Sequence, residues 1–499
     1  MAVAKGIGLA LVPFVISLAV YVSTSAPSIS WRHQGADGGD LAAAVYTDGV
    51  PHPPGYPTYL LLGKIFLRLI PGPEPAYSLN FMSAFFAAAT ASIIYLTLMA
   101  PSPVSGTRRL AALVAALSFA LSPLFWSQAT ITEVYTLNAF FAAFLTYLVK
   151  RAEFGSSAVL VPLAAFVLGL GFGNHHSLVL FAPGMILVMA AKGLRLRPAV
   201  GGLALFFLGL SVYLYLPWLA RQNPPINWGN AQDWSGLWWL VSGTPYRHYF
   251  FSVPILYWPG RLAAGAALMG QQFQWLGVGL GVWGLVSLWA RNRLWSFFTL
   301  SAFLLTLVYA LTYNTTDSYI YLIPAFLVFS LWLGEGLHAL LSLVPKPWGK
   351  GATAAALLVI LPGLSWYSNY QQMNLRDDFE AWHYAEEAFD QVEPRALIVA
   401  DGDAYIFSLW YFRYVHRRDS ETSIVAKPLL QYPWYADSLK KEGIWIPEDR
   451  TDLEAALGEI AKQNLPFRPI YMTYRDETLA QRWSLTKTGP LYRLGEKRD

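Results

Sequence analysis

Cysteine is absent from this chain of 499 residues, and charged residues are scarce, at 13% of the total. Without cysteine, no disulfide bond can stabilise a part exposed outside the cell, which favours a bacterial or archaeal source. Soluble domains carry about a quarter charged residues, whereas 55% of this chain is hydrophobic. The composition therefore indicates an integral membrane protein. The formal net charge of +4 is too small to indicate a nucleic-acid partner.

Long apolar runs, in contrast, are abundant. A helix needs about 20 apolar residues to cross the bilayer. Eleven segments are candidate spans: 7–25, 77–99, 110–127, 134–149, 157–173, 176–191, 198–219, 273–290, 294–313, 319–341 and 351–368. We expect the first segment to be a retained span rather than a cleaved signal peptide, because its apolar run exceeds a usual signal core.

Basic residues fall in alternate loops between these segments, for example at Arg108, Lys150, Arg291 and Lys350. Short cytoplasmic loops are enriched in Lys and Arg, so we expect these loops and the N-terminus to be cytoplasmic. An odd number of crossings then places the C-terminus outside. In this topology residues 35–75, the loop 220–262 and the C-terminal region are extracytoplasmic.

Two of these outer parts lie between candidate spans. Within 35–75, the segment 56–70 is apolar but short and basic, which predicts an amphipathic helix lying along the membrane surface. The loop 220–262 is rich in Trp, Tyr and Pro. It fits an interfacial anchor and equally a face that binds a sugar or a lipid phosphate, with Asn227 and Trp228 as candidates.

From about residue 370 charge rises and apolar runs shorten. Short buried-looking strands alternate with helical patterns, which indicates a small α/β domain. The expected strands are 395–400, 423–430 and 469–474, and the expected helices are 376–391, 403–416 and 451–463. The sequence thus predicts a mainly α polytopic protein, with a transmembrane domain over 1–368 and a soluble α/β domain over 369–499.

The polar groups beside the membrane are the candidates for chemistry, because such groups are costly in an apolar chain. Asp37 and Asp40 stand among glycines that would let the backbone approach a ligand. Either carboxylate could take a proton from an attacking hydroxyl. The alternative is that one of them caps the helix expected from Leu41.

His52 begins a Pro-Pro-Gly turn and could donate to a phosphate or orient a carboxylate. Tyr56 follows the turn, and Arg221 would lie at the mouth of an outer cavity, where it could pair with a lipid phosphate or simply extend to the interface. Further candidates on the same side are Glu133, His175, His176 and Asp317. No metal site is predicted, since the adjacent histidines point in different directions on a helix.

Several stretches resemble one known family. They are DGGDLAAA at 37–44, VPHPPGYPTYLLLGKI at 50–65, TEVYTLN at 132–138, GFGNHHS at 171–177, YLPWLARQNPPINWG at 215–229, DGDAYIFSLWYF at 401–412 and YPWYADSL at 432–439. They resemble the GT-C glycosyltransferases and, more narrowly, the family of the membrane O-mannosyltransferase that modifies IPT domains. Where relatives carry a second acidic residue as glutamate, this chain has Asp40.

The resemblance implies an inverting glycosyltransferase that uses a polyprenyl-phosphate sugar, with mannose as the sugar and a protein Ser or Thr hydroxyl as the acceptor. Asp37 would be the base, and His52 and Arg221 would stabilise the departing phosphate. No cofactor is required, although a divalent metal stays open. The alternatives are a lipid or glycan acceptor, or a flippase for a lipid-linked sugar. The expected location is the cytoplasmic membrane of a bacterium.

Overall fold

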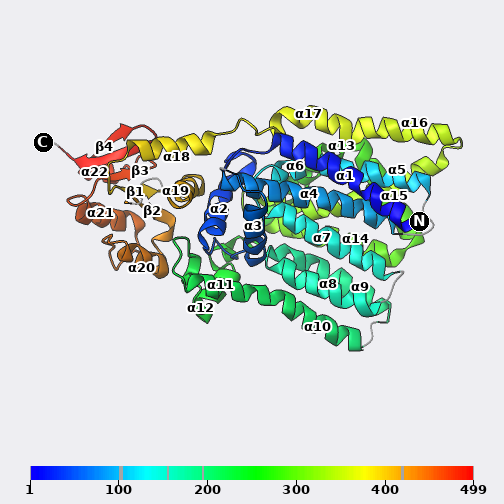
Figure 1. Ribbon diagram of the computed structural model, residues 1–499, viewed down its shortest axis with the longest axis horizontal. Helices are drawn as coiled ribbons and strands as arrows, with labels where there is room; N and C mark the ends of the chain where they lie inside the picture. The colour runs from blue at the N-terminus through cyan, green and yellow to red at the C-terminus, as the bar shows by residue number, and fades with distance from the viewer. Residues whose placement is uncertain are drawn as a thin grey trace.

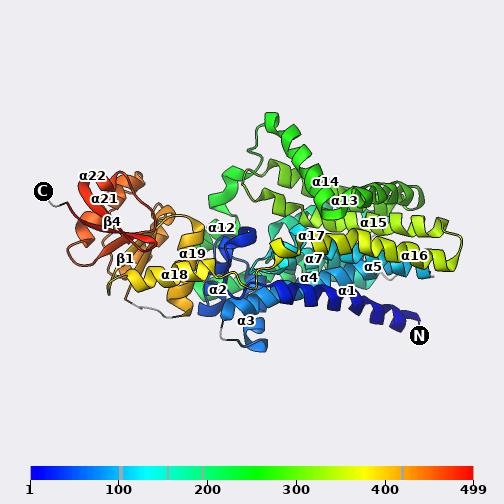
Figure 2. The same cartoon turned by 90° about the horizontal axis from the view of Figure 1, so that it is seen from above.

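The computed structural model describes residues 2–72, 74–100, 105–153, 157–193, 196–416 and 421–497. Figure 1 shows a bundle of long helices with an α/β region at one end and the start of α1 (Ala2–Thr24) at the other. The same order holds in the perpendicular view of Figure 2. The two short helices α2 (Gly38–Thr47) and α3 (Pro57–Leu69) lie between the bundle and the α/β region.

The bundle is built from apolar helices that pack along most of their length. Its remaining helices are α4 (Pro75–Met99), α5 (Gly106–Ala120), α6 (Pro123–Ala129), α7 (Tyr135–Ala152), α8 (Ser157–Phe172), α9 (Ala182–Ala191), α10 (Leu196–Leu210), α11 (Tyr215–Ala220), α13 (Trp258–Arg291), α14 (Arg293–Thr312), α15 (Ile323–Leu343), α16 (Pro347–Leu358) and α17 (Leu364–Met373). Short tight turns of helix join them: η2 (His176–Phe181), η3 (Ser211–Leu214), η7 (Ser318–Leu322) and the π-turn η8 (Val359–Gly363). Helix α15 is mostly apolar and nearly completely buried, which makes it the centre of the bundle.

The predicted count of eleven spans is not confirmed. Among the described residues, six helices are long and apolar enough to cross a membrane, and a seventh if the bent pair α5 and α6 forms one span. All eleven predicted segments are helical, but 8–24, 159–172 and 176–191 lie on shorter apolar helices. The predicted span 134–149 lies on α7, whose last turn carries Lys150 and Arg151.

The α/β region contains a five-stranded mixed sheet in the order β2-β1-β3-β5-β4. Its strands are β1 (Leu397–Ala400), β2 (Ser423–Ala426), β3 (Ile470–Met472), β4 (Trp483–Thr488) and β5 (Leu491–Glu496). The helices around it are α18 (Glu380–Gln391), α19 (Asp403–Val415), η9 (Lys427–Leu429), α20 (Pro433–Lys441), α21 (Leu453–Asn464) and α22 (Leu479–Arg482). The three expected strands are observed as β1, β2 and β3, whereas the antiparallel hairpin β4–β5 was not expected, because its strands are only partly apolar.

Contacts between distant parts of the chain join the α/β region to the first loop. Trp31 Nε1 donates to Ser408 Oγ at 2.9 Å and lies 3.0 Å from the Ala404 carbonyl, and Ser30 Oγ donates to Asp378 at 2.5 Å. At Gly39 a Cβ would come within 2.5 Å of the Phe407 carbonyl oxygen, so helices α2 and α19 approach closely there. Helix α19 is therefore fixed against the end of the bundle.

The aromatic loop also packs onto the first loop. It contains η4 (Trp228–Asn230), α12 (Trp234–Val241), η5 (Thr244–Tyr249) and η6 (Ile255–Tyr257). Val50 N donates to Ile226 O at 2.8 Å, and Trp228 N donates to Val50 O at 3.0 Å. This short parallel bridge fixes the position of Trp228 beside the turn that follows Val50.

The close packing of α13 on α15 gives a first prediction. A Cβ at Gly284 would overlap the carbonyl oxygen of Trp332, whereas a Cβ at Gly279 on the same helix meets nothing within 4 Å. We expect Gly284→Ala to separate the helices and lower the melting temperature of the purified protein by several degrees. Gly279→Ala should leave it unchanged or slightly raised, because alanine favours helix. Equal melting temperatures for the two variants would contradict this packing.

Candidate active site

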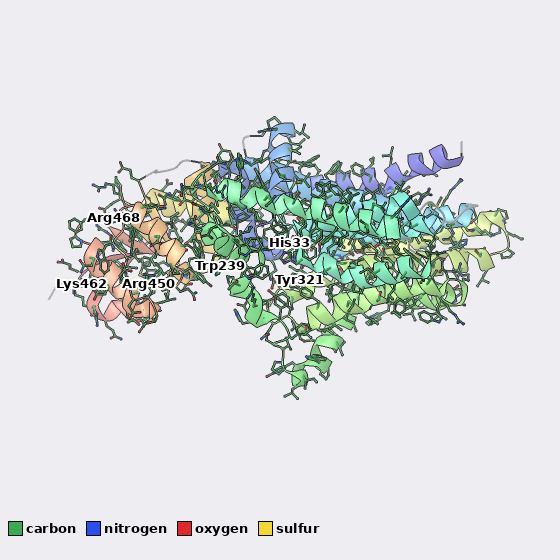
Figure 3. The ribbon with its side chains drawn as sticks, turned by 90° about the horizontal axis from the view of Figure 1, so that it is seen from below. His33, Trp239, Tyr321, Arg450, Lys462 and Arg468 are labelled. Atoms are coloured by element: carbon green, nitrogen blue, oxygen red, sulfur yellow. The ribbon has the colours of Figure 1, made fainter. Side chains whose placement is uncertain are left out.

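A cavity of about 650 Å³ lies where the first loop, the aromatic loop, the bundle and α19 meet. Figure 3 labels Tyr321 and His33 in this part of the molecule, away from Arg450, Lys462 and Arg468 in the α/β region. The lining residues used below are Asp37, His52, Tyr56, Tyr135, His175, His176, Tyr246, Tyr309, Tyr313, Asp317, Tyr321 and Asp403. The cavity thus combines carboxylates, histidines and many tyrosine rings.

Asp37 ends the short helix η1 (Arg32–Asp37) and precedes α2. His33 and Gln34 have φ of 60° and 63°, and this left-handed backbone turns the chain just before Asp37. The Asp37 side chain makes no capping hydrogen bond, and 38% of its surface is exposed. Burial of the surrounding loop raises its pKa from 3.8 to about 6, although the nearby His52 acts in the opposite direction. The carboxylate is thus free to meet a ligand and is more basic than an ordinary aspartate.

Asp40 has a different position, because its side chain is completely buried in the first turn of α2. Its Oδ2 accepts hydrogen bonds from the backbone N and from Nδ1 of His52, at 2.9 and 2.7 Å. Its Oδ1 accepts from Trp228 Nε1 at 3.1 Å. Neither Asp37 nor Asp40 makes a side-chain cap, so the capping alternative is wrong for both. Asp40 orients His52 and is not exposed to a ligand.

His52 lies between the two aspartates. Its Nδ1 faces Asp40, while its Nε2 is 3.5 Å from Asp37 Oδ2 and 3.1 Å from the Tyr56 hydroxyl. The ring stacks on Phe407 of α19, with ring centres 6.2 Å apart. Burial lowers the pKa of His52, but the carboxylates of Asp37 and Asp40 outweigh it and raise that pKa to about 9. An imidazolium therefore faces the cavity at neutral pH.

The glycines around the aspartates have a packing role rather than the expected role at a ligand. Added Cβ atoms at Gly38 and Gly39 would meet Thr132 and Phe407, not the cavity. These glycines allow α2 to lie directly against two neighbouring segments. Their effect on the site is indirect, because α2 supplies Asp40 and begins beside Asp37.

Of the other predicted carboxylates, Asp317 lines the cavity, whereas Glu133 is buried behind it and accepts a 3.2 Å hydrogen bond from Val134 N. Burial and the nearby carboxylate of Asp37 raise the pKa of Glu133 well above its usual value. His175 and His176 also line the cavity. His175 Nδ1 lies 2.8 Å from Ser177 Oγ, and His176 Nε2 lies 2.8 Å from the Tyr213 hydroxyl.

The structure does not bring every predicted residue into this cavity. Arg221 directly follows α11, is exposed and is not part of the lining. Asn227 lines a separate cleft of about 460 Å³ between the aromatic loop and α19. Trp228 lines the same cleft, is largely buried and contacts the site through Asp40. The lining of this cavity therefore does not support Arg221 as a partner of a phosphate bound there.

The sequence did not identify Asp403 or any of the lining tyrosines other than Tyr56 as candidates. Asp403 comes from α19, and burial raises its pKa above the usual value; nothing in its local sequence distinguishes it from a helix-capping residue. Tyr309, Tyr313, Asp317 and Tyr321 recur at every fourth position, which is a signal for one face of a folded segment. The described residues contain no group of three or more His, Cys, Asp or Glu side chains that could hold a metal ion.

The chain is similar in sequence to known membrane proteins. The family model "Protein O-mannosyl-transferase TMEM260 N-terminal domain" matches residues 37–197 and so begins at Asp37. The chain is 26% identical over 488 residues to Protein O-mannosyl-transferase TMEM260 of Mus musculus, covering 87% of this chain and 66% of that protein. It is 24% identical over 479 residues to the protein of that name from Dictyostelium discoideum, covering 85% and 57%. The predicted resemblance to this O-mannosyltransferase family is confirmed.

The chain spans less than two thirds of the length of these two curated relatives. Both are eukaryotic, so they do not support the predicted bacterial source. Among solved structures, the chain is similar to ArnT from Cupriavidus metallidurans bound to undecaprenyl phosphate, with a TM-score of 0.60 and 11% identity. That match covers 99% of this chain and 97% of the other. This likeness shows that the fold is GT-C-like.

The three hydrogen bonds of Asp40 give a second prediction. We expect Asp40→Ala to destabilise the protein by about 2 kcal/mol or more, because it leaves buried donors of His52 and Trp228 without an acceptor. Trp228→Phe removes one of these bonds and should be milder. Asp437→Ala, at an exposed side chain on α20, is the control and should stay within about 0.5 kcal/mol of the parent. Thermal unfolding in detergent measures the loss of stability of each variant. Equal losses for Asp40→Ala and Asp437→Ala would contradict the prediction.

Proposed function

We propose that this protein transfers a mannosyl group from a polyprenyl-phosphate donor to a Ser or Thr hydroxyl of a protein acceptor. The single observation that carries the proposal is the cavity in which a partly exposed carboxylate, Asp37, lies 3.5 Å from an oriented histidine, His52. Two further findings support it. The relatives are named protein O-mannosyl-transferases. The fold is GT-C-like, and a solved structure with a similar fold is bound to undecaprenyl phosphate.

The reaction assigns one role to each of these groups. Asp37 takes the proton of the acceptor hydroxyl as that oxygen forms a bond to the anomeric carbon of the sugar. The bond between the anomeric carbon and the phosphate oxygen breaks at the same time, and polyprenyl phosphate leaves with the electron pair. Attack from the side opposite the phosphate inverts the configuration at the anomeric carbon. No metal step is required for these atoms and charges to balance.

The departing phosphate needs positive charge or hydrogen-bond donors. Among the described residues that line the cavity there is no lysine or arginine, so the imidazolium of His52 is the cation available there. The hydroxyls of Tyr56, Tyr246 and Tyr313 line the same space and can donate hydrogen bonds. Asp40 holds the imidazolium in place from behind, which fixes the charge before the substrate binds.

The proposed orientation places the cavity on the extracytoplasmic side. The cavity is at the end of the bundle that carries the α/β region. Arg108 and Arg291, which both pair with Glu335, lie on helix ends that adjoin the loops with positive-inside character. A donor whose lipid chain stays in the bilayer would present its sugar at this end. The acceptor would approach from the water beside α19, where Asp403 faces the cavity.

Asp37 is the residue on which this mechanism depends. We expect Asp37→Asn to lower kcat by about 10²- to 10⁴-fold, since general-base catalysis contributes that much. Its melting temperature should hardly change, because the side chain makes no capping bond. The assay measures release of polyprenyl phosphate and mannose on an acceptor protein in liposomes. Asp437→Asn is the control; full turnover by Asp37→Asn, or lipid-linked sugar crossing liposomes without transfer, would exclude the proposal.

The pH profile of kcat/KM tests the two ionisations together. The base must be deprotonated, so activity should fall as the pH drops through about 6, the raised pKa of Asp37. The imidazolium must stay protonated, so activity should also fall as the pH rises through about 9. In His52→Gln the alkaline limb should vanish and the acid limb should move above pH 6, because His52 lowers the pKa of Asp37. His383→Gln, at an exposed histidine of α18, should keep the parental profile.

A further inference from the structure

A second cavity, of about 640 Å³, lies at the opposite end of the bundle from the site. Its walls come from α1, α4, α5 and α16, whose ends lie together, away from the α/β region, in both Figure 1 and Figure 2. The residues used below are Leu9, Val12, Tyr95, Ser105, Thr107, Arg109, Leu110, Leu113 and Lys350. The mechanism proposed above makes no use of this cavity.

Two cations face this space, and neither has an acidic partner among the described residues. Arg109 Nε is buried without a hydrogen-bond partner, and Lys350 forms no ion pair with any residue that the structure describes. The neighbouring Arg108 differs, because it is paired with Glu335 at 2.8 Å. No Asp or Glu is found among the described residues that line the cavity. Two partly buried cations without a counter-ion indicate that the occupant is an anion.

The remaining walls restrict the chemistry of that anion further. The hydroxyls of Ser105 and Thr107, which are 2.9 Å apart, and that of Tyr95 lie among the same lining residues. The other walls are apolar and follow Leu9 and Val12 of α1 and Leu110 and Leu113 of α5. A small hydrated anion would leave these walls facing water. An anionic head with hydrocarbon chains would cover both kinds of surface.

We propose that this cavity binds an anionic glycerophospholipid of the leaflet opposite the active site. Arg109 and Lys350 hold its phosphate, the hydroxyls of Ser105 and Thr107 donate to the headgroup oxygens, and an acyl chain lies along α1 and α5. The site is structural or regulatory, and it does not depend on the transfer reaction proposed above. The bound lipid would contact α16 together with α1, α4 and α5.

Native mass spectrometry of the full chain in detergent tests this, with phosphatidylglycerol and phosphatidylcholine of identical acyl chains as probes. We expect phosphatidylglycerol to be retained more strongly than phosphatidylcholine. The double variant Arg109→Gln, Lys350→Gln should weaken phosphatidylglycerol binding about twenty-fivefold, since each cation near an anionic lipid contributes a factor of about five. The charge-conserving pair Arg109→Lys, Lys350→Arg should retain most of the binding and also shows that the cavity tolerates substitution.

The matched control removes the same two charges elsewhere at the same end of the bundle. Lys192→Gln with Arg293→Gln is suitable, because both side chains are exposed and neither lines the cavity. This control should bind phosphatidylglycerol as the parent does. An equal loss in the control would overturn the proposal in favour of general surface charge. Equal retention of the two lipids, or full competition by millimolar inorganic phosphate, would also overturn it.

Discussion

The buried pair of Asp40 and His52 is the interaction on which the candidate site depends. A completely buried carboxylate needs a charged or hydrogen-bonded partner, and Asp40 has three donors, two from His52 and one from Trp228. The same bonds leave one histidine nitrogen directed at Asp37 and the cavity. The buried Asp40 thus fixes the position of His52, and His52 sets the charge beside Asp37. The two carboxylates share a glycine-rich turn but have separate tasks.

The rest of the architecture keeps this pair in place. The bundle supplies a rigid end onto which the first loop packs, and the aromatic loop adds Trp228 through its bridge to Val50. Helix α19 closes the arrangement, since Phe407 stacks on His52 while Asp403 faces the cavity. A GT-C-like bundle by itself would therefore supply only part of the site.

Asp37, Asp40 and His52 could be named as candidates from the sequence because each belongs to a local pattern that is costly in an apolar chain. Charged groups among glycines beside an apolar run, and a histidine before Pro-Pro-Gly, are visible without any knowledge of the fold. The separate roles of the aspartates could not be predicted, because burial depends on Trp228 and Phe407, which come from distant segments. The expectation that Arg221 lines the cavity was not met for a related reason. A loop on the same side of the membrane does not determine the direction in which a long side chain extends.

The same reasoning explains the outcome for the fold. Continuous apolar runs predicted helices at all eleven places, but not how many of them are long enough to cross a bilayer, since turns such as that at His175 interrupt them. Short buried strands were recognisable by their β-branched residues, as in β1 and β2. The half-exposed hairpin β4–β5 lacks that signal and depends on pairing with β3.

The indole of Trp31 donates to the carbonyl of Ala404, 373 positions further along the chain. A ribosome releases these two segments far apart in time, and the helices between them enter the membrane first. The pocket around His52 is consequently incomplete until α19 has been made and has packed against the first loop. A portion of the chain without α19 would lack both the ring that stacks on His52 and the carboxylate of Asp403.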